Sequence, residues 1–194
     1  MKKQLLNVTR FLVGVLFIFS GLVKANDPLG LSYKMQEFFD VWHMPAFNHY
    51  TLVLAVVMII FEIVAGVAVL LGWRMKLFGW LLLLLILFFS FLTGYAVLSG
   101  KIRECGCFGD CIPLQAMGSF IKDLILLGLI LFLFAYRKKI QPLFSKNASI
   151  LILVFSLILS FSIQWYALQY LPFIDCLPYK AGANIPEKMK PAPG

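Results

Sequence analysis

The residues best suited to chemistry in this sequence are its cysteines, of which there are 4. Cys105, Cys107 and Cys111 are crowded into the run ECGCFGDC, and Cys176 lies much further along the chain. Thiols at such short spacing pair as disulfides, exchange disulfides with other proteins or bind a metal. The cysteines therefore predict a redox site, a structural disulfide or a metal centre.

Cys105 and Cys107 are the candidate redox pair. In an extended chain, two Cα atoms separated by one residue are at most about 7 Å apart, and a disulfide needs Cα atoms roughly 4.4 to 6.8 Å apart. A bridge between these thiols therefore requires a bend, for which Gly106 supplies the backbone freedom. Because a small, strained ring is readily reduced, we favour a catalytic pair over a purely structural one.

The other two cysteines are candidates for a structural disulfide. Four cysteines allow three complete pairings, and the pairing that joins Cys105 to Cys107 also joins Cys111 to Cys176. This second bond would tie the last apolar segment to the redox loop. The alternative is that all four thiols pair for stability alone.

A metal site is the weakest of the three interpretations. Zn or Cu would recruit the three clustered thiols together with His43 or His49. The spacing lacks the paired Cys-x-x-Cys units that usually hold such ions. We therefore expect no bound metal.

The chain that carries these cysteines has the composition of a membrane protein. Of its 194 residues, 61% are hydrophobic and 13% are charged, against roughly 45 to 50% and 25% in soluble domains. Several apolar stretches approach the roughly 20 residues that cross a bilayer as a helix. This excludes a soluble one-domain enzyme, and membrane topology explains the formal net charge of +8 better than nucleic-acid binding does.

Hydropathy predicts an all-α integral membrane protein with five spanning helices. A four-helix transmembrane bundle occupies residues 1–140 and includes the outer cysteine loop at 99–118; a fifth spanning helix occupies 141–171, and an outer tail or linker occupies 172–194. The apolar spans themselves cover residues 8–23, 52–72, 77–99, 120–136 and 149–171. Between the first two spans, apolar residues at helical spacing predict an interfacial helix over 31–42.

The distribution of basic residues predicts that the N-terminus is inside and the C-terminus outside. With this orientation the inner face carries bases and no acid, whereas bases and acids balance on the outer face. The inner bases are Lys2, Lys3, Arg10, Arg74, Lys76, Arg137, Lys138, Lys139 and Lys146. All four cysteines then lie outside, on the oxidising periplasmic side of a bacterial inner membrane. Cysteines alone cannot carry electrons across the membrane in this arrangement, so the acceptor must be lipid-soluble or an outer partner.

Charged residues in or beside the spans are candidates for a polar site. Glu62 lies near the predicted bilayer midplane, where inserting an acidic side chain costs about 2.5 to 3.5 kcal/mol of free energy. A functional interpretation is that Glu62 relays protons or hydrogen-bonds to a bound headgroup. The alternative is a buried polar contact between helices. Lys24 ends the first span, where snorkelling to the surface explains it and Asp27 or Asp123 are alternative partners. Asp123 is expected at the N-terminal end of the fourth span, where an acid is favourable.

Aromatic residues around the outer half of the third span are the candidates for a quinone site. The chain contains 19 Phe, 7 Tyr and 4 Trp, and Phe89, Tyr95 and Phe108 fall near the cysteine loop. A cleft of such rings would hold a flat molecule, although Phe in membranes mostly faces lipid. We take quinone, either ubiquinone or menaquinone, as the expected electron acceptor.

Several of these residues together resemble a known membrane family. The stretch from Arg10 through FIFSG to Lys24, then Glu62, then CGCFGD resembles the DoxX-like family, in its MauE/DoxX redox-associated branch, over about residues 8–140. The relatives are four-helix membrane proteins linked to disulfide formation in exported partners or to quinone-coupled sulfur oxidation. The resemblance implies that the Cys-Gly-Cys residues are the redox pair and that Lys24 and Glu62 are the polar positions of the bundle. Cys111, Cys176 and the fifth helix depart from the pattern.

These observations predict a membrane thiol-disulfide oxidoreductase. Its expected partners are exported thiol proteins or a thioredoxin-like protein, together with membrane lipid, and it passes electrons to quinone. The alternative is a non-enzymatic assembly or maturation factor with structural disulfides. A small-solute transporter ranks last, because Glu62 is the only clearly ionisable residue that we expect deep in a span.

Overall fold

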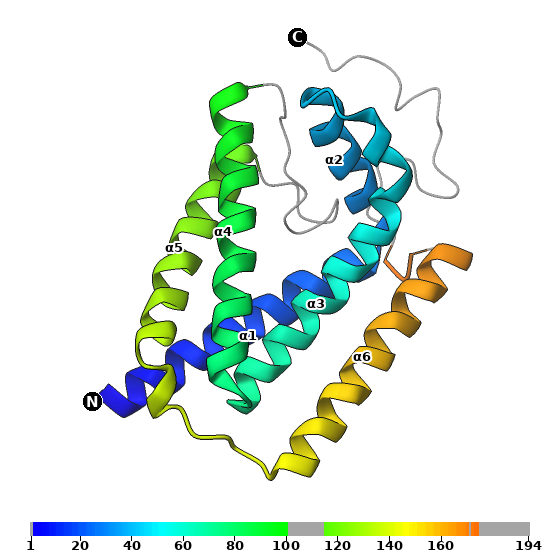
Figure 1. Ribbon diagram of the computed structural model, residues 1–194. Coiled ribbons are helices and arrows are strands. Elements are labelled where there is room, and N and C mark those ends of the chain that lie inside the picture. The colour runs from blue at the N-terminus through cyan, green and yellow to red at the C-terminus, as the bar shows by residue number, and fades with distance from the viewer. Residues whose placement is uncertain (1, 101–114, 171, 175–194) are drawn as a thin grey trace.

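The computed structural model describes residues 2–100, 115–170 and 172–174, and within these ranges it contains helices and turns but no strand (Figure 1). All four cysteines and Phe108 lie outside the described residues. The elements are α1 (Lys2–Ala25), α2 (Pro28–Val41), the 3-10 helix η1 (Pro45–Tyr50), α3 (Thr51–Leu71), α4 (Met75–Ser99), α5 (Ala116–Ala135), the 3-10 helix η2 (Arg137–Lys139) and α6 (Lys146–Gln169). The all-α prediction is therefore confirmed for the described part of the chain.

Five of these helices, α1, α3, α4, α5 and α6, are long and apolar enough to cross a membrane. They match the five predicted spans. α1 packs most extensively against α3, and α4 packs against α5, while α6 lies along α3 at the edge of the molecule. Only 22% of the most apolar window of α6 is buried, against 44% for that of α1, so the fifth spanning helix is the least enclosed by protein.

The helix ends divide into two groups at opposite ends of the molecule. One end of the molecule holds the starts of α1, α4 and α6 and the ends of α3 and α5. The other end holds α2, the starts of α3 and α5, and the ends of α1, α4 and α6 (Figure 1). The chain segments that contain the cysteines, 101–114 and 175–194, are thus joined to helix ends of the second group. We call this second end of the molecule the cysteine end.

The predicted helix between the first two spans is present as α2, and it begins earlier than the hydropathy pattern indicated. Asp27 caps it by accepting a hydrogen bond from the backbone nitrogen of Gly30 at 2.9 Å, and Pro28 occupies its first turn. The buried side chains of Leu31 and Phe38 attach α2 to the spanning helices. α2 therefore covers part of the cysteine end.

α1 and α3 approach each other closely because glycines face each other across their contact. A Cβ atom at Gly66 would lie 2.9 Å from the carbonyl oxygen of Gly14 and 2.9 Å from the side chain of Ile18. Small residues allow such close backbone contact between membrane helices. This contact sets the distance between the polar side chains that α1 and α3 carry.

We expect Gly66→Ala to destabilise the protein, because the added methyl group would meet backbone atoms of α1. Overpacking of this kind costs about 1 to 3 kcal/mol. Gly128→Ala in α5 is the matched control, since a Cβ atom at Gly128 meets nothing within 4 Å. Thermal unfolding of both variants in detergent tests this expectation. Equal melting temperatures would show that the α1–α3 contact accommodates the added methyl group.

Candidate functional site

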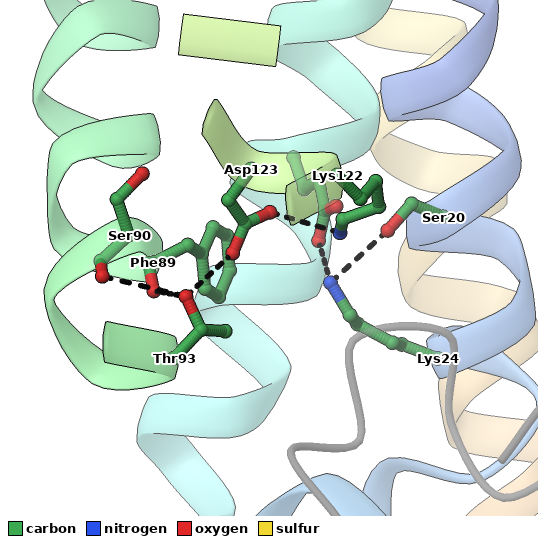
Figure 2. Close-up of polar contacts among 8 residues, drawn as sticks. Ser20, Lys24, Phe89, Ser90, Thr93, Lys122 and Asp123 are labelled. Atoms are coloured by element: carbon green, nitrogen blue, oxygen red, sulfur yellow. Dashed lines mark hydrogen bonds and ion pairs between the residues drawn. The ribbon is translucent and has the colours of Figure 1, made fainter. Parts of the chain in front are cut away.

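A buried ion pair joins α1 to α3 inside the membrane-spanning part of the protein. Nζ of Lys24, in the last turn of α1, lies 2.7 Å from Oε2 of Glu62 on α3, and the two side chains are 2% and 4% exposed. Nζ of Lys24 also donates a hydrogen bond to Oγ of Ser20, one turn earlier on α1, at 3.2 Å (Figure 2). Both charges are thus neutralised within the protein.

The position of Lys24 corrects the prediction that this side chain snorkels to the surface. Lys24 is fully buried and points inward toward Glu62. Neither of its predicted partners pairs with it: Asp27 caps α2, and Asp123 pairs with its own neighbour, Lys122. Lys24 lies on the face of α1 that packs against α3, where a carboxylate offsets the cost of burial.

A second buried polar group joins α4 to α5. Oγ1 of Thr93 lies 3.0 Å from Oδ2 of Asp123, to which it can donate a hydrogen bond, and Asp123 is 1% exposed (Figure 2). Nζ of Lys122 lies 3.0 Å from Oδ1 of Asp123. This contact is an ion pair without hydrogen-bond alignment, since Oδ1 has no hydrogen-bond donor among the described residues. Each carboxylate oxygen of Asp123 thus lies beside one polar group.

The depth of Asp123 differs from the prediction that it lies at a helix N-terminus. α5 begins at Ala116, so Asp123 is about two turns into the helix. The predicted span began at residue 120, so the helix has one turn more than predicted. This turn is the sequence AMGS, whose mixed polarity does not mark it as part of a span. Asp123 consequently faces α4 within the protein and does not interact with the free backbone groups at the start of α5.

The two ion pairs share one small cavity. It measures about 30 Å³ and is lined by Lys24, Glu62, Lys122 and Asp123, with Phe89 among its apolar walls. A water molecule needs roughly 10 to 15 Å³ and several polar partners, and this cavity offers both. We call these four charged residues, together with Ser20 and Thr93, the buried polar cluster.

Of the three aromatic residues proposed to hold quinone, Phe89 lies at the buried polar cluster. Its ring centroid is 4.7 Å from Nζ of Lys24, a distance at which a cation interacts favourably with the ring face. Tyr95 belongs to another group, with its ring centroid 5.6 Å from that of Trp42, the residue that follows α2. A benzene-sized ring occupies a cavity of about 150 Å³, so the space beside Phe89 fits water and not a quinone ring.

Metal ligands do not gather within the described part of the chain. No three His, Cys, Asp or Glu side chains lie close enough there to hold an ion. His43 and His49 are both exposed at the cysteine end. The cysteines proposed to join them lie in the segments outside the described ranges.

Sequence reasoning missed part of this site. Glu62 was expected to be the only ionisable residue deep in a span, yet Lys24, Asp123 and Arg10 are also buried within spanning helices. The signal that could have found Asp123 was a longer fourth span. For Lys24 the signal was the glycine-containing face of α1, which marks the side that packs against another helix.

Chemically, the buried polar cluster brings ionisable side chains and hydroxyls together. It places two carboxylates, two ammonium groups and the Ser20 hydroxyl around one space large enough for water, with the Thr93 hydroxyl beside Asp123. Ionisable groups inside a membrane protein cost free energy and mark proton or ligand pathways by default. The cluster connects four spanning helices, α1, α3, α4 and α5.

Removal of the Thr93 hydroxyl should destabilise the protein measurably. Thr93→Val removes the hydroxyl that lies beside Oδ2 of Asp123 and the carbonyl of Phe89, and hydrogen bonds to charged groups contribute about 1.5 to 3 kcal/mol. Thr9→Val is the matched control, because the buried Thr9 hydroxyl bonds to the carbonyl of Leu5 in its own helix, as Thr93 does to that of Phe89, and has no carboxylate beside it. Thermal unfolding in detergent should show a clearly lower melting temperature for Thr93→Val only; equal shifts would mean that Asp123 finds another donor.

Comparison with known proteins identifies the family. The family described as "Methylamine utilisation protein MauE" matches residues 2–136, which include α1 through α5 and leave α6 outside. No curated protein and no solved structure matches the chain. The matched region contains the whole buried polar cluster and the Cys-Gly-Cys segment. With more than half of its length matched and five helices able to span a membrane, the chain belongs to the MauE family of multi-pass membrane proteins.

Proposed function

We propose that this MauE-family protein is a membrane thiol-disulfide oxidoreductase. Cys105 and Cys107 exchange a disulfide with exported thiol proteins or a thioredoxin-like partner, and the electrons pass to membrane quinone. The protein acts in the bacterial inner membrane with its cysteines on the periplasmic side. The observation that carries the proposal is the buried polar cluster, whose Thr93, Lys122 and Asp123 lie on α4 and α5, the two helices that bracket the Cys-Gly-Cys segment.

The two steps of the reaction balance in electrons and protons. A substrate thiolate attacks the Cys105–Cys107 disulfide and forms a mixed disulfide, which the second substrate thiol resolves. The substrate leaves with a disulfide, and the protein is left with two thiols. Oxidation of these thiols back to the disulfide delivers two electrons and two protons, which convert quinone to quinol.

The buried polar cluster suits the proton part of this reaction. Glu62 and Asp123 line one cavity with Lys24 and Lys122, and its volume of about 30 Å³ is enough for a water molecule between these groups. A buried ion pair is weak evidence for stability, because well-packed apolar residues often replace one without loss. The cost of keeping four charges inside the membrane therefore supports a functional role for them.

Quinone enters the proposal as a substrate, without assigned binding residues. The cavity beside Phe89 measures about 30 Å³, which is smaller than the ring, and Tyr95 packs elsewhere. No step is therefore assigned to these two aromatic side chains. The role of Phe89 in the proposal is to contact the ammonium group of Lys24.

The alternative is a non-enzymatic assembly or maturation factor, in which disulfides among the cysteines are structural. The absence of a ring-sized space beside Phe89 among the described residues favours it. The name of the family refers to methylamine utilisation, which is a metabolic process and is compatible with both candidates. The two candidate functions differ in catalysis, because only the enzyme oxidises many thiol substrates per protein molecule.

Oxidation of a dithiol peptide tests the proposal against this alternative. The purified protein is placed in liposomes with a soluble quinone and an excess of a reduced peptide that contains two cysteines. The proposal predicts many equivalents of peptide disulfide per protein, each matched by one quinol. Peptide oxidation no faster than in protein-free liposomes would overturn the enzymatic proposal and favour the assembly factor.

A further inference from the structure

A second and much larger cavity lies at the end of the molecule opposite the cysteine end. It measures about 740 Å³ and is enclosed by the first turns of α1, the end of α5 and the linker that leads to α6. Ligand sites in proteins typically have volumes of about 300 to 1,000 Å³. None of its lining residues belongs to the buried polar cluster, so this cavity is independent of the proposed redox chemistry.

Arg10 provides a buried positive charge in the wall of this cavity. It lies within α1, is only 7% exposed, and its Nη1 donates a hydrogen bond to the carbonyl oxygen of Gln141 at 3.2 Å. Gly72, with φ of +68°, makes room for the guanidinium, since a Cβ atom there would lie 2.9 Å from Nη1. Three separate parts of the chain thus hold the Arg10 side chain in place.

Among the described residues, the guanidinium of Arg10 makes one hydrogen bond, to the carbonyl of Gln141. A guanidinium carries five N–H donors, and no carboxylate among the described residues forms an ion pair with Arg10. Lys139 of η2 lines the same cavity, and its Nζ lies 5.3 Å from the centroid of the Tyr136 ring. The surroundings contain no acid, because residues 2–10, 72–76 and 136–146 include neither Asp nor Glu. The cavity therefore attracts anions.

The remaining lining of the cavity is largely apolar. Leu6 and Phe132 form part of the wall, and the exposed side chains of Leu5 and Leu143 extend it to the outer surface of the helices. At a rise of about 1.5 Å per residue, Arg10 lies roughly 12 Å along α1 from its first residue. The cavity thus combines a cationic centre with apolar walls that open toward lipid.

We propose that this cavity binds an acidic phospholipid, with Arg10 and Lys139 on its phosphate and Leu6 and Phe132 against the start of its acyl chains. Arginine forms paired hydrogen bonds with phosphate oxygens, and basic pockets between membrane helices on the cytoplasmic side bind acidic lipid headgroups. The apolar walls favour a lipid over free phosphate as the source of the anion.

The proposal is tested by measuring lipid binding to the purified full-length protein in detergent. The probes are short-chain phosphatidylglycerol, short-chain phosphatidylcholine and inorganic phosphate, with bound lipid counted by native mass spectrometry. Lys139→Gln should weaken phosphatidylglycerol binding about fivefold, the factor expected for one base near the headgroups. Lys138→Gln is the matched control, since Lys138 is the exposed neighbour that does not line the cavity, and it should leave binding unchanged.

Arg10→Gln should weaken binding more than tenfold, because hydrogen bonds to charged groups contribute about 1.5 to 3 kcal/mol. If Arg10→Gln fails to fold, the exposed Lys139 still tests the site. Equal binding of phosphatidylglycerol and phosphatidylcholine, or equal loss in Lys138→Gln and Lys139→Gln, would overturn the proposal. Binding of inorganic phosphate but not of phosphatidylglycerol, with the same dependence on Lys139, would replace the lipid with a soluble anion and overturn it as well.

Discussion

Cys105→Ser and Cys107→Ser are each expected to abolish dithiol oxidation with quinone. The reaction needs both sulfurs of the Cys-Gly-Cys segment, one to form the mixed disulfide with the substrate and one to leave as the thiolate. Serine has nearly the same shape and cannot take part in disulfide exchange. Peptide oxidation in liposomes should therefore fall to the rate of protein-free liposomes in both variants.

Cys111→Ser and Cys176→Ser are the controls for this prediction. If Cys111 and Cys176 form a structural disulfide, their loss lowers the free energy of unfolding by about 2 to 4 kcal/mol and leaves turnover at temperatures where the protein is folded. The two variants should also have similar melting temperatures, since each breaks the same bond. Equal loss of turnover from all four substitutions would instead indicate a relay through all the thiols.

The second large effect is expected at the buried ion pair of Lys24 and Glu62. Lys24→Met and Glu62→Leu each leave one charge buried without its partner, since the two side chains are 2% and 4% exposed. Such losses cost about 3 to 5 kcal/mol. Each single variant should therefore melt well below the natural protein in detergent, or fail to accumulate in membranes.

The double variant Lys24→Met/Glu62→Leu separates structure from function. It removes both charges together, so it should be much more stable than the sum of the two single changes implies. If the pair carries protons, the folded double variant has lost most of its quinone-linked turnover. A double variant that is stable and fully active would reduce the pair to a structural contact between α1 and α3.

The sequence was sufficient to predict the elements that follow from hydrophobicity. The five spanning helices and α2 are each marked by long or periodic apolar runs, and these patterns depend on local composition alone. The same patterns do not specify which helices pack together. The close α1–α3 contact at Gly14 and Gly66 is a tertiary feature, although glycines in apolar helices are an indication of it.

The partners of the charged residues were predicted less well, for the same reason. Lys24 sits at the end of an apolar run, and in the sequence this position looks the same whether the side chain faces lipid, water or another helix. Only the rotation of α1 against α3 places it on Glu62. Asp123 was assigned the wrong depth because α5 extends about one turn beyond its most apolar residues.

Arg10 illustrates a third limit. It lies close to the predicted inner edge of the first span, where an arginine usually reaches water and needs no explanation. Its burial results from the linker before α6, whose Gln141 carbonyl accepts its hydrogen bond, and from the turn at Gly72. Contacts that join residues about 130 positions apart in the chain cannot be read from local patterns.

The central claim, that the cysteines pass electrons to quinone, is tested most directly on the thiols of the protein itself. The purified protein is reduced, freed of reductant and mixed with a soluble quinone in detergent, while free thiols and quinol absorbance are measured together. The proposal predicts that two thiols disappear for each quinol formed, and that neither change occurs in Cys105→Ser. Thiols that remain reduced in the presence of quinone, with no quinol formed, would contradict it.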